Sequence, residues 1–233
     1  MIKALFFDVF GTVVDYRSSV TREMQKLSEA NGWDFSAEQF ADDWRNLYNP
    51  SMEPVRSGER PYTRLDILHR ENLDQLIDKY GIDNLSEEEK DHLNRIWHRL
   101  DPWPDSVPGL LRLKSKFVLA TMSNGNVSLM VNMAKHAGLP WDMILGSEPA
   151  KSYKPVPKTY LTGADWLDLK PEQICMVAAH NGDLRAAREL GFKTAFILRP
   201  TEKGPNQTID VKAEEDWDYS VNSMEELADA LGC

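Results

Sequence analysis

The hydrophobic and polar positions of the chain follow two patterns that alternate along its length. Short apolar runs bounded by turns predict strands buried on both faces, and stretches with apolar residues at helical spacing predict helices between them. This alternation is typical of a parallel sheet covered by helices on both sides. The strands are predicted within residues 3–14 and at 117–122, 143–146, 174–179, 194–198 and 219–221, and the helices at 108–116, 127–137, 158–166, 183–190 and 223–231.

A long segment of helical pattern interrupts the alternation after the first strand. Residues from about 15 to 100 contain no strand pattern, and a proline-rich loop is predicted at residues 49–54. Ser86, with Glu89 three residues later, predicts a capping box at the start of a further helix. We therefore predict an α/β core formed by residues 1–14 and 101–233, and a helical cap domain, residues 15–100, that can act as a lid.

The composition narrows the class of protein. A chain of 233 residues, 42% of them hydrophobic, can build one large domain or one domain with an insertion. The formal net charge of -10 and the lack of any run of Lys and Arg argue against a nucleic-acid partner, because phosphates would repel such a surface. A small anionic substrate would instead need a local cluster of cations.

The sequence also predicts where such a protein works. No apolar run approaches the roughly 20 residues that span a bilayer, and the first residues lack the basic, apolar and small-residue regions of a signal peptide. Cys175 and Cys233 are the only cysteines and form neither a C-x-x-C motif nor a disulfide framework. We expect a cytoplasmic enzyme with no membrane segment.

Asp8 interrupts the apolar run of the first strand. An ionised carboxylate is costly to desolvate without partners, and the carboxyl ends of strands in an open α/β sheet face the ligand crevice. Asp8 is therefore the candidate nucleophile. The alternative is a carboxylate that caps a nearby turn.

Polar groups also follow three of the other predicted strands. Residues 123–126, Ser-Asn-Gly-Asn, offer hydroxyl, amide and backbone N–H groups at a helix start, which is an anion cradle or a helix cap. Lys154 precedes a proline, which favours an extended backbone, although a lone loop lysine is usually solvated surface. Asp183 follows the strand at 174–179 and could equally be a helix start. Four such groups at one sheet edge indicate a site more strongly than any one of them.

The order of these motifs resembles the haloacid dehalogenase superfamily. The resemblance rests on Asp8-x-x-x-Thr12, Ser123-Asn124-Gly125, Lys154-Pro155 and Asp183, and it covers nearly the whole chain. It implies a Rossmann-like parallel-sheet core with a helical cap inserted after the first strand. Within the superfamily the chain is similar to the type II (L-2-haloacid) dehalogenases, because it has Trp44-Arg45 in the cap, Tyr160 six residues after Lys154, and Phe10 two residues after Asp8.

Phe10 separates this resemblance from the other activities of the superfamily. Its phosphatases typically carry a second Asp at that position, which protonates the leaving group, and they hold magnesium between carboxylates. A halide leaves without protonation, so phenylalanine suits dehalogenation better than phosphoester hydrolysis. We therefore expect no metal and no cofactor. The alternatives are a magnesium-dependent phosphatase or phosphonatase, and a non-catalytic protein that binds a small anion on the same fold.

The resemblance implies a covalent mechanism. Asp8 attacks C2 of a short 2-haloalkanoate and displaces halide, and water then attacks the carboxyl carbon of the aspartyl ester. Inversion at C2 converts an L-2-haloacid to the D-2-hydroxy acid, or a haloacetate to glycolate. The halogen preferred, release of fluoride included, and the chain length accepted stay open, and a homodimer is common among these enzymes.

The resemblance also implies roles for individual residues. Lys154 and Asp183 orient Asp8 and the hydrolytic water, with Thr12 and Tyr160 as supporting donors. His180 stands where these enzymes usually have Asn, and it is either a hydrogen-bond partner or base, or a structural histidine. Asn181 beside it is counted with the catalytic residues. The halide cradle is predicted from Arg45 and Asn124, and the carboxylate site from Ser123 and the backbone amides of Val9 and Phe10.

Overall fold

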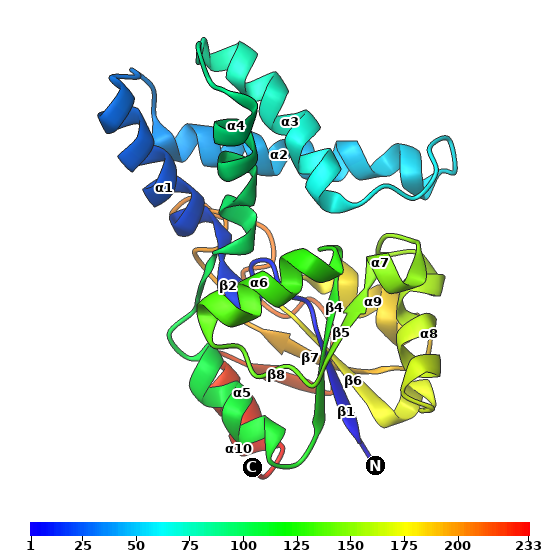
Figure 1. The fold of residues 1–233 in the computed structure, drawn as a ribbon. Helices are drawn as coiled ribbons and strands as arrows, with labels where there is room; N and C mark the ends of the chain where they lie inside the picture. The colour runs from blue at the N-terminus through cyan, green and yellow to red at the C-terminus, as the bar shows by residue number, and fades with distance from the viewer.

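The core of the molecule is a six-stranded parallel sheet (Figure 1), seen in a computed structural model that describes all residues from Met1 to Cys233. The strand order is β5-β4-β1-β6-β7-β8, and every neighbouring pair runs parallel. This order places β1 between β4 and β6, so the residue after β1 lies at the middle of the carboxyl edge. The strands are β1 Ala4–Phe7, β4 Val118–Ser123, β5 Met143–Gly146, β6 Ile174–Ala178, β7 Lys193–Ile197 and β8 Tyr219–Val221.

Both faces of the sheet are buried, as the apolar runs predict. Along β1, Leu5 and Phe7 join one hydrophobic cluster and Ala4 and Phe6 join the other. The first face is covered by α5 (Ser106–Lys114), α6 (Val127–Ala137) and α10 (Met224–Ala230), and the second by α8 (Pro157–Trp166) and α9 (Asn181–Glu189). Two short elements, α7 (Ser147–Ala150) and the 3-10 helix η2 (Pro171–Gln173), complete the core. The predicted α/β fold is confirmed.

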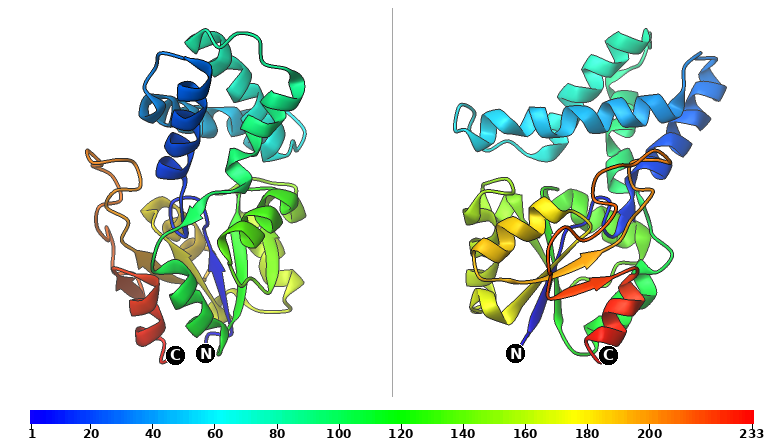
Figure 2. Two further views of the ribbon diagram at one scale, coloured as in Figure 1. Left: turned by 60° about the vertical axis from the view of Figure 1, so that its left-hand side comes forward. Right: turned by 180° about the vertical axis from the view of Figure 1, so that it is seen from behind.

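The helical segment stands over the carboxyl edge of the sheet (Figures 1 and 2). It contains α1 (Tyr16–Asn31), α2 (Ala37–Arg56), α3 (Leu65–Tyr80), α4 (Glu87–Asn94) and the 3-10 helix η1 (Arg95–His98). Its two connections to the core, β2 (Val14–Asp15) and β3 (Asp101–Pro102), pair antiparallel with each other. The division into domains at residues 14/15 and 100/101 stays a prediction, and it falls at this pair of strands.

The predicted loop at residues 49–54 is wrong, because α2 continues through Pro50 and Pro54 to Arg56. A proline inside a helix removes one hydrogen bond and usually kinks or ends the helix. Here Met52, fully buried between the two prolines, keeps this turn packed against the rest of the cap. Arg56 ties the helix end to the core by donating from Nε to the carbonyl of Lys154 at 2.9 Å. Tertiary contacts therefore outweigh the local signal.

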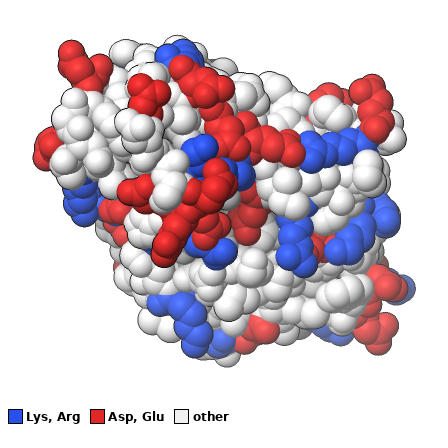
Figure 3. All heavy atoms as spheres, turned by 45° about the horizontal axis from the view of Figure 1, so that its top comes forward, with Lys and Arg blue, Asp and Glu red and all other residues white.

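Other local signals are correct. The capping box at Ser86 is formed, with the Glu89 backbone N–H donating to Ser86 Oγ at 3.3 Å and the Ser86 N–H donating to Glu89 Oε2 at 2.7 Å. None of the helices combines the length and the apolar character needed to cross a membrane. On the face shown in Figure 3, Lys and Arg lie in small separate groups among Asp and Glu, so no continuous basic region covers it.

Candidate active site

Asp8 lies directly after the central strand and is 7% exposed. Its backbone N–H donates to the carbonyl of Val177 at 3.0 Å, which continues the ladder between β1 and β6 by one step. The side chain is thereby held at the carboxyl edge of the sheet, beneath the cap. A carboxylate buried at this depth needs compensating partners.

Three side chains supply those partners. Lys154 Nζ donates to Asp8 Oδ1 at 2.9 Å, Thr12 Oγ1 donates to Oδ2 at 2.7 Å, and His180 Nδ1 lies 3.1 Å from Oδ2. Burial alone would raise the pKa of Asp8, but the charges and hydrogen bonds of Lys154 and His180 hold it well below its ordinary range. Asp8 is therefore ionised and oriented, which a nucleophile requires. The alternative role as a turn cap does not account for partners so distant in the chain.

Lys154 joins two carboxylates. Its Nζ contacts Asp183 Oδ2 as well as Asp8, and Tyr160 donates its hydroxyl to Asp183 Oδ1 at 2.5 Å. Burial alone would lower the pKa of Lys154, but Asp183 and Asp8 raise it above its usual value. Burial and the neighbouring Asp183 charge raise the pKa of Tyr160 far above the usual range. The lysine is a cation and the tyrosine a neutral donor.

Free hydrogen-bond donors lie along the same edge. The backbone N–H groups of Val9 and Phe10 donate to no other group of the chain. Asn124 Oδ1 accepts from the Lys154 N–H at 2.9 Å and from Ser147 Oγ at 2.8 Å, which leaves its Nδ2 as a donor. Ser123 Oγ accepts from the Gly125 N–H at 3.1 Å and keeps its own hydrogen. Such an arrangement suits an anion.

Arg45 approaches from α2 of the cap. Its guanidinium lies between two aromatic rings, with Cζ 4.5 Å from the ring centre of Tyr16 and 4.1 Å from that of Tyr48. Its Nη1 is buried and has no hydrogen-bond partner. Burial alone would lower the pKa of Arg45, but Tyr16 and Tyr48, followed by more distant carboxylates that include Asp8, raise it. A half-buried cation whose Nη1 is a buried and unused donor is unlike the surface arginine that a cap helix usually carries.

Phe10 forms an apolar wall between the core and the cap. Its ring meets Tyr48, His69 and Trp97 edge-on, with ring centres 6.2, 6.4 and 5.8 Å apart. The position that would carry a second carboxylate is therefore packed inside an aromatic cluster. No three His, Cys, Asp or Glu side chains of the chain are grouped so that they could hold a metal ion.

Asn181 does not join this network. Its Nδ2 donates to Asp210 and to the carbonyl of Lys212, and its Oδ1 accepts from the Glu214 N–H and from Trp217 Nε1. All four bonds of the amide are thus used to hold the loop that precedes β8. The predicted catalytic role is not supported by these contacts, and we interpret Asn181 as structural.

Glu202 is the residue that the sequence did not reveal. Both of its carboxylate oxygens lie 2.9 Å from His180 Nε2, and its side chain is fully buried. It belongs to the irregular segment after β7, where no periodic pattern or motif marks it. The two aromatic residues beside Arg45 were equally unmarked, because Tyr16 and Tyr48 follow an ordinary helical core pattern.

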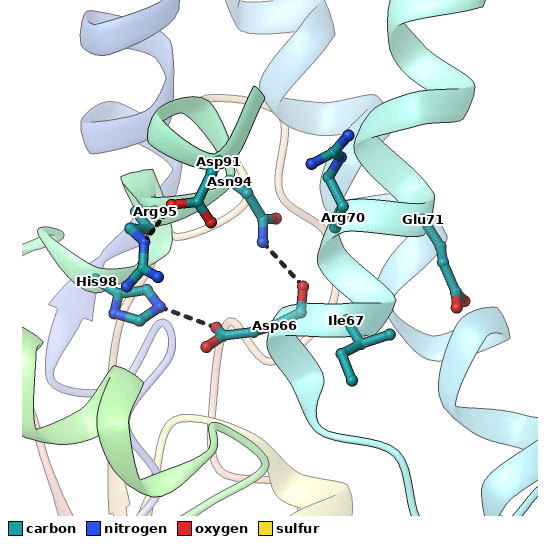
Figure 4. A pocket seen from close by; sticks show the side chains of 8 residues that line it. All are labelled: Asp66, Ile67, Arg70, Glu71, Asp91, Asn94, Arg95 and His98. Atoms are coloured by element: carbon teal, nitrogen blue, oxygen red, sulfur yellow. Dashed lines mark hydrogen bonds and ion pairs between the residues drawn. The ribbon is translucent and has the colours of Figure 1, made fainter. Parts of the chain in front are cut away.

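A pocket lies within the cap, between α3 and the α4–η1 segment (Figure 4). Its charged side chains already have partners: Arg95 pairs with Asp91 and His98 with Asp66, while Arg70 and Glu71 pair with residues outside the pocket. Asp66 also accepts from Asn126 Nδ2 at 2.9 Å, so this cluster fastens the cap to the loop after β4. We interpret it as a structural contact between cap and core.

Comparison with known proteins agrees with this geometry. The chain is 47% identical to the defluorinating L-2-haloacid dehalogenase Rha0230, whose crystal structure superposes with a TM-score of 0.97 over 100% of this chain and 96% of that one. The L-2-haloacid dehalogenase PA0810 is 45% identical, with a TM-score of 0.96 over 100% and 99% of the two chains.

Curated relatives and a family match point the same way. The (S)-2-haloacid dehalogenase 4A of Burkholderia cepacia is 28% identical over 97% of this chain and 93% of its own. The haloacid dehalogenase-like hydrolase family matches residues 2–191. The strand-end cluster, the cap and these matches have one explanation: the chain belongs to the haloacid dehalogenase-like hydrolase family.

Proposed function

We propose that this protein hydrolyses short 2-haloalkanoates, converting an L-2-haloacid to the D-2-hydroxy acid or a haloacetate to glycolate, through an ester on Asp8. The observation that carries the proposal is the pairing of two features. Asp8 is an ionised and oriented carboxylate, and Arg45 is a half-buried cation whose Nη1 is a buried and unused donor. The dehalogenases among the relatives support the substrate class.

The first half of the reaction is a displacement at C2. A carboxylate oxygen of Asp8 forms a bond to C2, and the halide leaves with the electron pair of the carbon–halogen bond. Lys154 and Thr12 hold the carboxylate in one orientation, which supplies the near-attack geometry that displacement needs. The substrate carboxylate accepts from the free N–H groups of Val9 and Phe10 and from Ser123.

Negative charge moves to the halogen during this step. Arg45 Nη1, held between Tyr16 and Tyr48, donates to the departing halide, and Asn124 Nδ2 contributes from the core. A donor fixed in a water-poor site stabilises the transition state more than the neutral carbon–halogen bond of the ground state. Because Arg45 comes from the cap, the site is complete only when cap and core are together.

In the second half, water attacks the carboxyl carbon of the Asp8 ester and releases the hydroxy acid. Lys154 and Asp183 keep the ester carbonyl oriented, with Tyr160 fixing Asp183. The reaction uses no cofactor and no metal ion. A magnesium-dependent phosphatase is less well supported, because Phe10 stands at the second carboxylate position and Asp183 is committed to Lys154 and Tyr160.

The test is halide release over a panel of 2-haloacids. Fluoro-, chloro- and bromoacetate and the two enantiomers of 2-chloropropionate are compared, and fluoroacetate belongs in the panel because Rha0230 is described as defluorinating. We expect halide and hydroxy acid in equal amounts, with the L enantiomer preferred. Release of phosphate from phosphoesters, without halide release, would contradict the proposal. Assembly as a homodimer stays a prediction, to be checked by light scattering.

A further inference from the structure

His180 lies between two buried carboxylates. Its Nδ1 is 3.1 Å from Asp8 Oδ2, and its Nε2 is 2.9 Å from each oxygen of Glu202. Glu202 comes from the segment after β7, and its side chain has no exposed surface. His180 is the one hydrogen-bonding partner of that carboxylate. A buried charge is costly, so a carboxylate whose sole partner is His180 Nε2 points to a role in holding the imidazole ring.

The surrounding backbone makes room for Glu202. Gly11 has a φ of +86°, and a Cβ built on it would lie 2.2 Å from Glu202 Oε1. Any side chain at position 11 would therefore displace the carboxylate. Arg199, three residues before Glu202, donates from Nε to the carbonyl of Thr12 at 3.0 Å and pairs with Asp105. The segment that carries Glu202 is thus tied to the loop that carries the nucleophile.

Few other groups beside Asp8 could accept a proton from water. Lys154 is held as a cation by two carboxylates, and the two oxygens of Asp183 are bonded to Lys154 and Tyr160. Thr12 uses its hydroxyl as a donor to Asp8. His180 is the remaining basic side chain in contact with the Asp8 carboxylate.

We propose that Glu202 and His180 act as a dyad in the hydrolysis of the Asp8 ester, with His180 as the general base and Glu202 as the positioning residue that fixes its tautomer. The inference rests on the proposed function. When Nε2–H donates to Glu202, the lone pair of neutral His180 is on Nδ1, the nitrogen that faces Asp8. A carboxylate behind a histidine fixes orientation and tautomer in this way in other hydrolases.

The charges around His180 determine when in the reaction it loses its proton. Burial alone would lower the pKa of His180, but Glu202 and Asp8 raise it to about 10, so the free enzyme holds an imidazolium. Asp210 also interacts with the charge of His180, and Lys154, a cation bonded to Asp8, has the opposite effect. Formation of the ester removes the charge of Asp8, which releases the His180 proton to solvent.

The protons of the whole reaction balance in this scheme. Dehalogenation turns substrate and water into hydroxy acid, halide and one proton, and the His180 proton released to solvent is that proton. Water bonds to the Asp8 carboxyl carbon while His180 Nδ1 takes one of its hydrogens. The bond between that carbon and the substrate oxygen breaks, and His180 returns the hydrogen to the alkoxide. The new carboxylic acid of Asp8 protonates His180 and restores the free enzyme.

The experiment is a single turnover of chloroacetate by Glu202→Gln, followed by halide assay and intact-protein mass spectrometry. We expect about one equivalent of chloride to be released at close to the wild-type rate, while the ester on Asp8 decays about 100-fold to 1000-fold more slowly and accumulates. Glu214→Gln, an exposed glutamate of the following loop, is the matched control and should behave as wild type. Circular dichroism checks that each variant is folded.

The pH profile of ester decay separates positioning from mere packing. Ester hydrolysis needs neutral His180, so its rate rises with pH through the pKa of His180 in the ester. Removing the charge of Glu202 lowers that pKa, and the rise moves to lower pH in Glu202→Gln while the maximum rate falls. His180→Gln serves as a second variant, with the ester accumulating and no such pH-dependent rise. If ester decay does not depend on neutral His180, its pH profile keeps the same position in Glu202→Gln, and the dyad is overturned.

The outcomes distinguish this inference from the proposed function. If wild-type protein releases no halide and carries no ester, the proposed function fails. If wild type forms the ester, but Glu202→Gln and His180→Gln both hydrolyse it at the wild-type rate, only the dyad is overturned. If Glu202→Gln does not fold, the decay rate in His180→Gln decides alone.

Discussion

Asp8 and Arg45 are charged residues that each place polar atoms out of contact with solvent, but these atoms differ in whether the protein supplies their partners. Asp8, in the core, has each carboxylate oxygen bonded to side chains of the protein. Arg45, in the cap, rests between two aromatic rings and leaves Nη1 without a partner. The difference indicates that the proposed nucleophile is organised before substrate binds, whereas the proposed halide site is completed by the ligand.

The largest effect should follow from removing the charge of Asp8. Asp8→Asn has no anionic nucleophile, and we expect turnover of chloroacetate to fall by about four orders of magnitude or more, as when other covalent enzymes lose their nucleophile. The measurement is chloride release, with Asp216→Asn, a fully exposed aspartate, as the control. An Asp8→Asn variant with wild-type turnover would rule out covalent catalysis by this residue.

Isotope labelling sharpens the same point in the wild-type protein. A single turnover in heavy-oxygen water should place the label in the Asp8 carboxylate, because water attacks the ester carbonyl and not C2. Peptide mass spectrometry locates the label. Label found solely in the hydroxy acid would mean that water attacks C2 directly.

The next largest effect on turnover should follow from removing Arg45, the residue whose Nη1 has no partner. Arg45→Ala removes the donor to the departing halide. We expect the activation free energy to rise by about 3 to 4 kcal/mol, so that turnover falls by two to three orders of magnitude, with a smaller change in KM. The loss should be greater for fluoride than for bromide, because fluoride is more basic and harder to release. Arg45→Lys should rescue only in part, since it lacks the planar fork of donors. Near wild-type turnover of Arg45→Ala on every halide would contradict a halide site in the cap.

Asp8 and Arg45 also differ in how well their roles could be predicted from the sequence. The site around Asp8 was predictable because its residues follow strands, and the strand pattern places strand ends at one edge. The role of Arg45 came from family resemblance alone, since nothing local distinguishes it from a surface arginine on a helix. The structure adds the two aromatic rings, of Tyr16 and Tyr48, that lie beside its guanidinium.

The remaining gaps have physical causes of their own. Strand and helix positions such as α6 at Val127–Ala137 follow from periodicity and a closing glycine, and they agree to the residue. The continuation of α2 through two prolines could not be predicted, because contacts with distant residues hold it. Glu202 was missed for a related reason: its contact with His180 depends on the path of an irregular loop.

A smaller effect is expected in the pH dependence of stability, and it concerns His180, one of the partners of Asp8. The folded-state pKa of His180, about 10, lies above its ordinary value of 6.5. Its contribution to the free energy of unfolding is therefore fully present below pH 6.5 and is lost as pH rises from there through 10. We expect this loss, about 1 to 3 kcal/mol after allowance for screening, in wild type and not in His180→Gln. Urea unfolding at pH 6 and pH 10 measures it, with the more exposed His136→Gln as control.

The aromatic rings beside Arg45 should contribute less. Stacking of a guanidinium on a buried ring contributes about 1 to 2 kcal/mol, so Tyr48→Leu should lower turnover by roughly tenfold through loss of the arginine's orientation. Tyr48→Phe keeps the ring and is the matched control, expected to stay within about twofold of wild type. Equal losses in both variants would show that the hydroxyl, and not the ring, matters at this position.

The smallest expected effect is that of a chelator, and it follows from the satisfied state of Asp8. In a magnesium enzyme, the metal would neutralise carboxylates at the strand ends and bind the substrate oxygens. Here Lys154 and His180 already neutralise Asp8, Lys154 and Tyr160 occupy Asp183, and the ring of Phe10 fills the place of a further carboxylate. A metal would have to displace the lysine to gain two ligands. Chloride release should therefore stay within about twofold of its original rate after dialysis against excess chelator, and added magnesium should change nothing. Complete loss of activity that magnesium restores would mean that this carboxylate cluster opens around a metal, and the phosphatase would then be the better interpretation.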